Sequence, residues 1–144
     1  MKRKITHGRV LFGALFFALL LANGCKKKTV EPDARTVQLE KLTSTWKVKT
    51  VDNDGADVTS QYTGFTLIID QLTYSTQNGG NPWPASGTYD FKGSDLTKLV
   101  RSDNVEVSID EITDKTLVLT FNYNTVNGGR VNGITGDFTF SLTK

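Results

Sequence analysis

The feature that most constrains this fold is a series of short runs in which apolar and polar residues alternate. From Leu117 to Tyr123 every second residue is large and apolar, and Phe65–Asp70 and Phe138–Thr143 follow the same rule. Because successive side chains of a strand point to opposite faces, this pattern predicts strands with one buried and one solvated face. Eight runs are expected to be strands: Trp46–Thr50, Phe65–Asp70, Leu72–Thr76, Thr88–Lys92, Leu96–Arg101, Val105–Asp110, Leu117–Tyr123 and Phe138–Thr143.

Clusters of turn-forming residues separate these runs. They are Asn53-Asp54-Gly55, Asn78–Pro82, Gly93-Ser94-Asp95, Ser102–Asn104 and Asn127–Gly129. Such short connections join antiparallel neighbours, since a parallel pair needs a crossover of about a dozen residues or more. A meander of this size usually closes into a barrel, which removes its exposed edges. The expected fold is therefore all-β, a small antiparallel up-and-down barrel of about eight strands over residues 37–144.

The first 24 residues have the layout of a secretory signal peptide. The cations Lys2, Arg3, Lys4 and Arg9 precede an apolar stretch, Val10–Ala22, that contains no charge. As a helix this stretch would reach about 20 Å, which is short of the ~30 Å hydrocarbon core of a bilayer. We therefore expect residues 1–24 to be a targeting segment.

Cys25 is the only cysteine of the chain and follows Leu21-Ala22-Asn23-Gly24. This stretch resembles the bacterial lipobox, in which a small residue precedes a cysteine that is diacylated and becomes the mature N-terminus. Looser lipoboxes of this kind are typical of Bacteroidota lipoproteins. The alternative is a plain signal peptide followed by a stray thiol. A lipid anchor accounts better for one cysteine that has no internal partner.

Residues 25–36 are expected to be the lipidated cysteine and a flexible tether, because they offer almost nothing to bury. Surface-exported lipoproteins of Bacteroidota often carry acidic residues directly after the cysteine, whereas this tether begins with Lys26-Lys27-Lys28. The resemblance to Bacteroidota lipoproteins therefore implies an outer-membrane lipoprotein that faces the periplasm rather than one exported to the cell surface. Removal of residues 1–24 changes the net charge from +2 to −2, so the basic character belongs to the signal peptide and tether. Nucleic-acid binding is therefore not expected.

Leu39, Leu42 and Trp46 recur at spacings of three and four, which predicts a short helix that leads into the first strand. The segment Leu42-Thr43-Ser44-Thr45-Trp46-Lys47-Val48 resembles the entrance to lipocalin-like barrels. Leu99–Val107 and Leu117–Tyr123 are similar to segments of small lipocalin-like lipoproteins of Bacteroidota. The resemblance implies a barrel over about residues 38–144 that carries a small apolar ligand.

The residues left after processing exclude several kinds of catalysis. His7 is the only histidine, and it leaves with the signal peptide. Ser–His and Cys–His nucleophilic systems are then impossible, as are zinc sites built on His or Cys. We expect a protein that is not an enzyme and that holds no metal or cofactor.

Two groups of carboxylates have other interpretations. Asp110, Glu111 and Asp114 crowd a hairpin and are expected to form a solvated turn, with an acid–base pair as the alternative. Asp52–Asp57 superficially resembles a calcium loop, but its glycine comes fourth and no bidentate Glu follows. We expect this segment to be a hairpin turn first of all.

Two loops offer candidate binding residues. Residues 127–136 are rich in glycine and are expected to form a flexible connection in which Arg130 could contact an anion. In Asn81–Gly87 two prolines stiffen a loop around Trp83. Trp83 either plugs one end of the barrel or forms an exposed platform for a sugar or a partner protein. Trp46 is expected to be a core residue.

Two functions follow, both in a monomer. In the first, the barrel binds a small apolar molecule inside. In the second, the barrel is solid and its loops contact a protein or glycan of the cell envelope, through Trp83 and Arg130. Eight strands enclose an interior that is either filled by side chains or holds one small ligand. The candidate ligand-binding residues are Trp83, Tyr89, Phe91, Leu119, Phe121, Arg130, Phe138 and Phe140.

Overall fold

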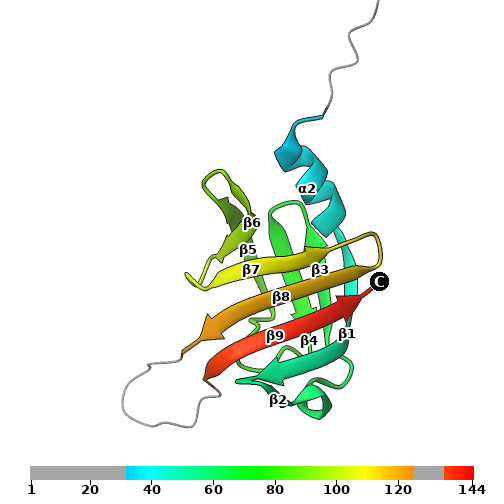
Figure 1. Ribbon diagram of the computed structural model, residues 1–144, viewed down its shortest axis with the longest axis vertical. Helices are drawn as coiled ribbons and strands as arrows, with labels where there is room; N and C mark the ends of the chain where they lie inside the picture. The colour runs from blue at the N-terminus through cyan, green and yellow to red at the C-terminus, as the bar shows by residue number, and fades with distance from the viewer. Residues whose placement is uncertain (1–31, 125–134) are drawn as a thin grey trace, which may run out of the picture. The chain divides into compact units, whose positions relative to one another are not determined.

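A computed structural model describes residues 32–124 and 135–144 (Figure 1). One α-helix, α2 (Ala34–Leu42), precedes a single nine-stranded sheet. The strands are β1 (Ser44–Asn53), β2 (Ala56–Asp57), β3 (Thr66–Asp70), β4 (Thr73–Gln77), β5 (Ser86–Lys92), β6 (Asp95–Arg101), β7 (Glu106–Ile112), β8 (Thr116–Tyr123) and β9 (Gly136–Thr143). A 3₁₀ turn, η1 (Thr59–Tyr62), lies between β2 and β3.

The strands close into an antiparallel up-and-down barrel. Apart from the short β2, each strand pairs with its neighbour in sequence, in the order β1-β3-β4-β5-β6-β7-β8-β9. Pairing of β1 with β9, from Lys47↔Thr143 to Asn53↔Phe138, completes the ring. The expected fold class and all eight expected strands are thus confirmed. The two-residue β2 and the turn η1 were not predicted from the alternation.

Helix α2 begins earlier than the sequence pattern indicated. The Asp33 side chain caps its N-terminus by accepting hydrogen bonds from the Arg35 backbone N–H and the Thr36 hydroxyl, both at 2.8 Å. Residues 34–36, expected to belong to the tether, are therefore helical, whereas Trp46 lies in β1 as expected. The Thr43 N–H donates to the Leu39 carbonyl and ends the helix.

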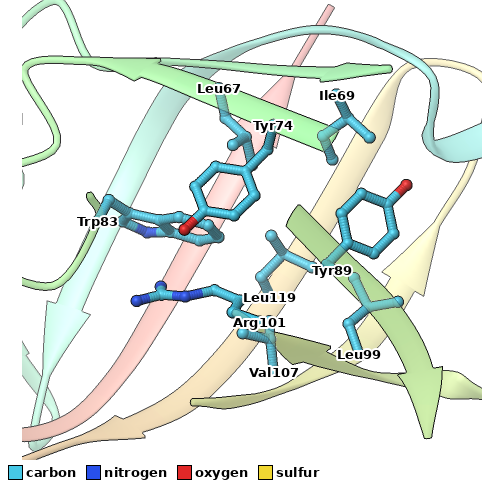
Figure 2. A pocket seen from close by; sticks show the side chains of 9 residues that line it. All are labelled: Leu67, Ile69, Tyr74, Trp83, Tyr89, Leu99, Arg101, Val107 and Leu119. Atoms are coloured by element: carbon cyan, nitrogen blue, oxygen red, sulfur yellow. The ribbon is translucent and has the colours of Figure 1, made fainter. Parts of the chain in front are cut away.

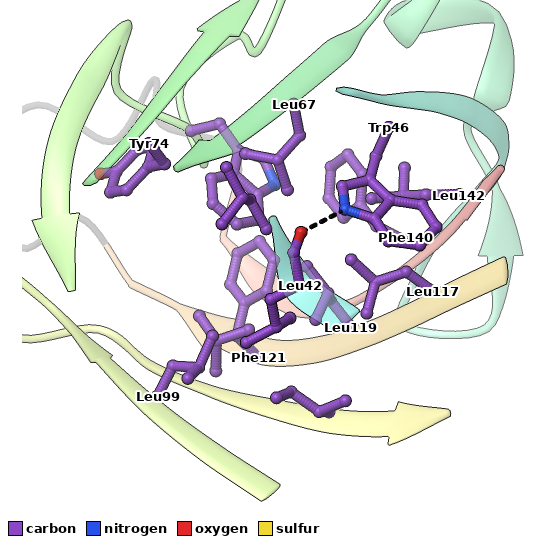
Figure 3. Packing of buried hydrophobic residues seen from close by; sticks show 14 of the residues in the cluster. Leu42, Trp46, Leu67, Tyr74, Leu99, Leu117, Leu119, Phe121, Phe140 and Leu142 are labelled. Atoms are coloured by element: carbon purple, nitrogen blue, oxygen red, sulfur yellow. Dashed lines mark hydrogen bonds between the residues drawn. The ribbon is translucent and has the colours of Figure 1, made fainter. Parts of the chain in front are cut away.

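The barrel interior is a continuous core to which every strand except the exposed β2 contributes buried residues. The six candidate ligand-binding residues that lie on strands are all at most 5% exposed: Tyr89, Phe91, Leu119, Phe121, Phe138 and Phe140. Trp46 is fully buried as expected, and its Nε1 donates to the Leu42 carbonyl at 2.8 Å (Figure 3). Lys144 Nζ lies 4.8 Å from the centre of the Trp46 ring.

The two ends of the barrel differ. At the helix end, α2 contacts β5 and β6: Arg35 pairs with Asp90, and the Gln38 side chain donates to the Leu96 carbonyl. The loop end carries η1 and the connections at 78–85 and 102–105. Since strands alternate in direction, these connections all fall at one end. In the part of the chain that the structure describes, no helix is long and apolar enough to cross a membrane.

Candidate ligand site at the loop end

The barrel interior is filled. The cavity inside it has a volume of only about 20 Å³, which is roughly the room needed by one water molecule. Pockets for small molecules usually measure about 300–1,000 Å³. Of the two expected states, hollow and filled, the structure has the filled one. The cavity is lined by Leu67, Ile69, Tyr74, Trp83, Tyr89, Leu99, Arg101, Val107 and Leu119 (Figure 2).

Trp83 plugs the loop end of the barrel. It is 4% exposed, and its ring packs against Phe121 and Tyr74 at centroid distances of 5.4 and 5.7 Å. The plug was one of the two expectations for this residue and is confirmed, whereas the exposed aromatic platform is wrong. Residues 80–82 of this loop form a turn, and Pro82 and Pro84 restrict the backbone on either side of the tryptophan.

Thr76 and Gly79 hold the Trp83 loop in place. The Thr76 hydroxyl donates to the Pro84 carbonyl at 2.9 Å, and the Thr76 N–H donates to the Ala85 carbonyl at 2.8 Å. A Cβ at Gly79 would lie 2.7 Å from the Trp83 Cβ, so only glycine allows this approach. Trp83 is therefore positioned by hydrogen bonds between its loop and β4 and by the close approach of Gly79.

Arg101 is the one charged residue among those described whose side chain is buried in the barrel; the residue is 3% exposed. Its Nε donates to Asp103 Oδ1 at 3.1 Å, its Nη2 pairs with Asp103 Oδ2, and its Nη1 donates to the Pro82 carbonyl at 2.8 Å. The guanidinium carbon lies 4.7 Å from the Trp83 ring centre and 5.5 Å from that of Phe121. The Tyr74 ring centre lies 5.9 Å away, so Arg101 is surrounded by one carboxylate, one carbonyl and three rings.

Asp103 stays ionised beside this guanidinium. Partial burial opposes its charge, but the hydrogen bonds and positive charge of Arg101 outweigh that effect and lower the pKa of the Asp103 carboxyl. The Asp103 side chain is 34% exposed, so water solvates part of it. In this ion pair the Arg101 side chain is therefore buried, whereas the Asp103 side chain is partly exposed to solvent.

Two polar groups next to Arg101 have no hydrogen-bond partner. They are the indole N–H of Trp83 and the hydroxyl of Tyr74, which belong to residues that are 4% and 5% exposed. Figure 2 shows the Tyr74 hydroxyl beside the Trp83 ring. Burial raises the pKa of Tyr74, with Arg101 acting in the opposite direction, so the hydroxyl is a neutral donor. Each unsatisfied group costs about 1–3 kcal/mol, and an acceptor placed here would recover that cost.

The other predicted site residues divide into two groups. Tyr89 and Leu119 line the cavity, and Phe121 lies against Arg101. Tyr89 donates its hydroxyl to the Gln71 carbonyl, and burial, with a smaller contribution from Asp70, raises the pKa of Tyr89 to about 12. Phe91, Phe138 and Phe140 are buried but do not line the cavity. Cys25 and Arg130 lie outside the described residues.

Arg101 and Tyr74 were missed as site residues, although a signal existed. Arg101 has the same parity as Leu99 in a predicted strand, which places it on the inner face. Asp103 follows two residues later and supplies a counter-charge. A cation on an apolar face with an acid close by indicates a buried ion pair.

The carboxylate groups behave as solvated or structural residues. Asp54 and Gly55 have positive φ values of 50° and 79°, and their loop joins the Asn53↔Ala56 pair, so the Asp52–Asp57 segment is the expected hairpin turn. Asp110 and Glu111 are exposed and accept hydrogen bonds from Thr120 and Thr116. Within residues 32–124 and 135–144, no three His, Cys, Asp or Glu side chains are close enough to hold a metal ion.

The fold and site define a class: a closed up-and-down barrel with a lipocalin-like strand order and a buried cation under a tryptophan plug. Comparisons of the chain with family models, with curated proteins and with solved structures gave no match.

Proposed function

We propose that this chain is a lipid-anchored protein of the cell envelope whose barrel binds a small molecule at the loop end, without catalysis. The anchor would be Cys25, and the membrane an outer membrane with the barrel on its periplasmic side. Support for the anchor is the lipobox-like sequence before the single cysteine. The resemblance to lipocalin-like lipoproteins of Bacteroidota supports the same assignment.

The observation that carries the binding function is the buried Arg101 with two unpaired donors around it. A buried ion pair contributes little net stability, because desolvation of both charges offsets their attraction. Unpaired buried donors lower stability further. A core that served packing alone would gain from apolar residues here, whereas convergent polar groups in an apolar interior are typical of a ligand site.

The filled interior means that a ligand must replace the Trp83 plug. The cavity of about 20 Å³ admits no organic molecule while the indole occupies its position. Lifting the loop costs the hydrogen bonds from Arg101 to Pro82 and from Thr76 to Pro84 and Ala85. In return, the Trp83 N–H reaches water. The loop therefore acts as a lid whose closed state carries a built-in penalty.

A second candidate function is contact with an envelope protein or glycan through the outer surface of the loop end. The filled interior favours it, because a solid barrel is a good scaffold for loops. The two candidates differ in where the ligand lies. Leu119→Phe adds volume beside the cavity and should abolish binding only when the ligand enters the barrel.

The anchor is tested by intact mass spectrometry of the full chain extracted from membranes of an expressing bacterium. We expect loss of residues 1–24 and a diacylglyceryl modification on Cys25. The Cys25→Ser variant should show neither. A wild-type chain that carries a free thiol would show that the lipid anchor does not exist.

Ligand binding is tested on the same detergent-extracted chain by native mass spectrometry, followed by solvent extraction. A discrete mass that Leu119→Phe abolishes, with the circular dichroism of the barrel unchanged, is the expected result. A bound molecule that survives Leu119→Phe would favour the surface candidate. No bound mass in either protein, from any source of envelope extract, would remove the small-molecule function.

A further inference from the structure

The segment Pro82–Trp83 satisfies Arg101 in two separate ways. The Pro82 carbonyl accepts from Nη1 at 2.8 Å, and the Trp83 ring covers the guanidinium face at 4.7 Å. The lid thus presents an acceptor oxygen and a flat aromatic ring to one cation. Any molecule that displaces the lid must supply both features to leave Arg101 equally well satisfied.

Asp103 pairs with only one of the two edges of the Arg101 guanidinium that can bind a carboxylate. Asp103 occupies the edge formed by Nε and Nη2. The other edge, formed by Nη1 and Nη2, faces no carboxylate, and the one further hydrogen bond given for the guanidinium is that from Nη1 to the Pro82 carbonyl. A carboxylate matches such an edge with two parallel hydrogen bonds. Water solvates part of the Asp103 carboxylate. A second carboxylate can therefore approach Arg101 without the repulsion that two fully buried carboxylates would exert on each other.

We propose that the ligand of the loop end is a small planar aromatic carboxylate; this rests on the proposed function. Its carboxylate takes the Nη1–Nη2 edge of Arg101, and its ring replaces the indole of Trp83. The Tyr74 hydroxyl, which has no partner in the closed barrel, donates to the same carboxylate. Leu67, Leu99 and Val107 then surround the ring as part of the existing cavity lining.

The charge of the ligand follows from competition with the lid. Pro82 is covalently attached and always close, so a ligand with a neutral carbonyl makes the same bond and gains nothing over it. Charge-assisted hydrogen bonds are roughly twice as strong as neutral ones. A carboxylate therefore displaces the Pro82 carbonyl, whereas the matching amide does not.

The experiment compares 2-naphthoate with 2-naphthamide, two bicyclic probes of the same shape, by isothermal titration of the full chain in detergent. We expect naphthoate to bind at least tenfold more tightly than naphthamide. Benzoate, which does not fluoresce in the tryptophan range, should shift the Trp83 emission to longer wavelength as the indole reaches water. A Trp46→Phe background isolates this signal.

Three variants test the contacts. Tyr74→Phe removes only the hydroxyl and should lower naphthoate affinity about tenfold. Tyr62→Phe is the matched control, because its buried hydroxyl is also unpaired but does not line the cavity, and it should have no effect. Arg101→Lys keeps the charge, loses the planar edge and should lower the affinity more than tenfold, with circular dichroism reporting that the barrel is intact.

The outcomes separate this inference from the proposed function. Equal affinity for naphthoate and naphthamide, or equal loss in Tyr74→Phe and Tyr62→Phe, would overturn the aromatic carboxylate. A discrete co-purified ligand of another chemistry would also overturn the aromatic carboxylate, but it would support the proposed binding of a small molecule. If neither probe binds and native mass spectrometry finds no ligand, both the inference and the proposed function fail.

Discussion

Gly87→Ala is a direct test of the packing that positions Tyr74 in the site. Gly87 lies opposite Tyr74 in the β4–β5 pair, and the tyrosine ring covers it. A Cβ at position 87 would lie 2.6 Å from the Tyr74 Oη, 2.8 Å from its Cζ and 2.9 Å from its Cε1. Real Cβ atoms do not approach other heavy atoms this closely, so the ring must move.

The expected destabilisation follows from two opposing effects. Overpacking a well-packed site costs about 1–3 kcal/mol. The alanine also reduces the freedom of the unfolded chain, which is worth roughly 0.5–1 kcal/mol in a strand. We therefore expect Gly87→Ala to lower the free energy of unfolding by about 1–2 kcal/mol, which corresponds to a melting temperature lower by about 4–8 °C. Thermal and urea unfolding followed by circular dichroism measure both quantities.

The control is the same substitution in a Tyr74→Leu background, where the ring is gone. There Gly87→Ala should be neutral or stabilise by up to about 1 kcal/mol, so the double-mutant cycle should give a coupling energy of about 1–3 kcal/mol. An equal cost in both backgrounds would refute the reasoning, because the tyrosine ring would then not be the obstacle.

Three further predictions concern the ion pair, the core and the helix cap. The folded pKa of Asp103 is lowered, so its contribution to stability is complete above the unfolded pKa of about 3.9 and is lost as pH falls through the folded value. Melting temperatures between about pH 5 and pH 2 should therefore fall less steeply in Asp103→Asn; an unchanged slope would contradict this. Trp46→Phe removes the donor to the buried Leu42 carbonyl and should lower the free energy of unfolding, measured in urea, by about 1–3 kcal/mol. An unchanged free energy of unfolding would mean that water replaces the hydrogen bond. Asp33→Ala removes the cap of α2 and should destabilise the helix by about 1 kcal/mol. Hydrogen exchange of the amides should then become faster in α2 of the variant, with no change in β8; equal protection of α2 in the variant and the wild type would argue against the cap.

The architecture was predictable because alternation is a local property of each strand. In β8 the burial of Leu117, Leu119 and Phe121 follows directly from their spacing. The hairpin at Asp54-Gly55 was predictable for the same reason, since its turn type depends on two residues. The start of α2 was missed because the capping bonds of Asp33 carry no hydrophobic periodicity.

The filled interior could not be predicted, because it depends on residues that approach from outside the strand pattern. Trp83 enters from a loop and Tyr62 from η1, and both occupy space that alternation assigns to no strand. Arg101 is a different case, since its parity was visible but charged residues are usually expected on the outer face. The candidate site lies where the loop residue Trp83 contacts the inward-facing Arg101, neither of which the alternation of apolar residues assigns to the core.

The pairing of β1 with β9 also determines when this barrel can form. Its contacts join the two ends of the domain, so loop-closure entropy must be overcome before they stabilise anything, and folding is expected to be slow. Until β9 is available, Val48 and Val51 of β1 lack their cross-strand partners Leu142 and Phe140. The hairpins between β3 and β8 can form earlier, but the ring cannot close before β9 pairs with β1. For an exported protein, as we propose for this one, this means that the finished barrel forms only after β9 has become available for pairing with β1.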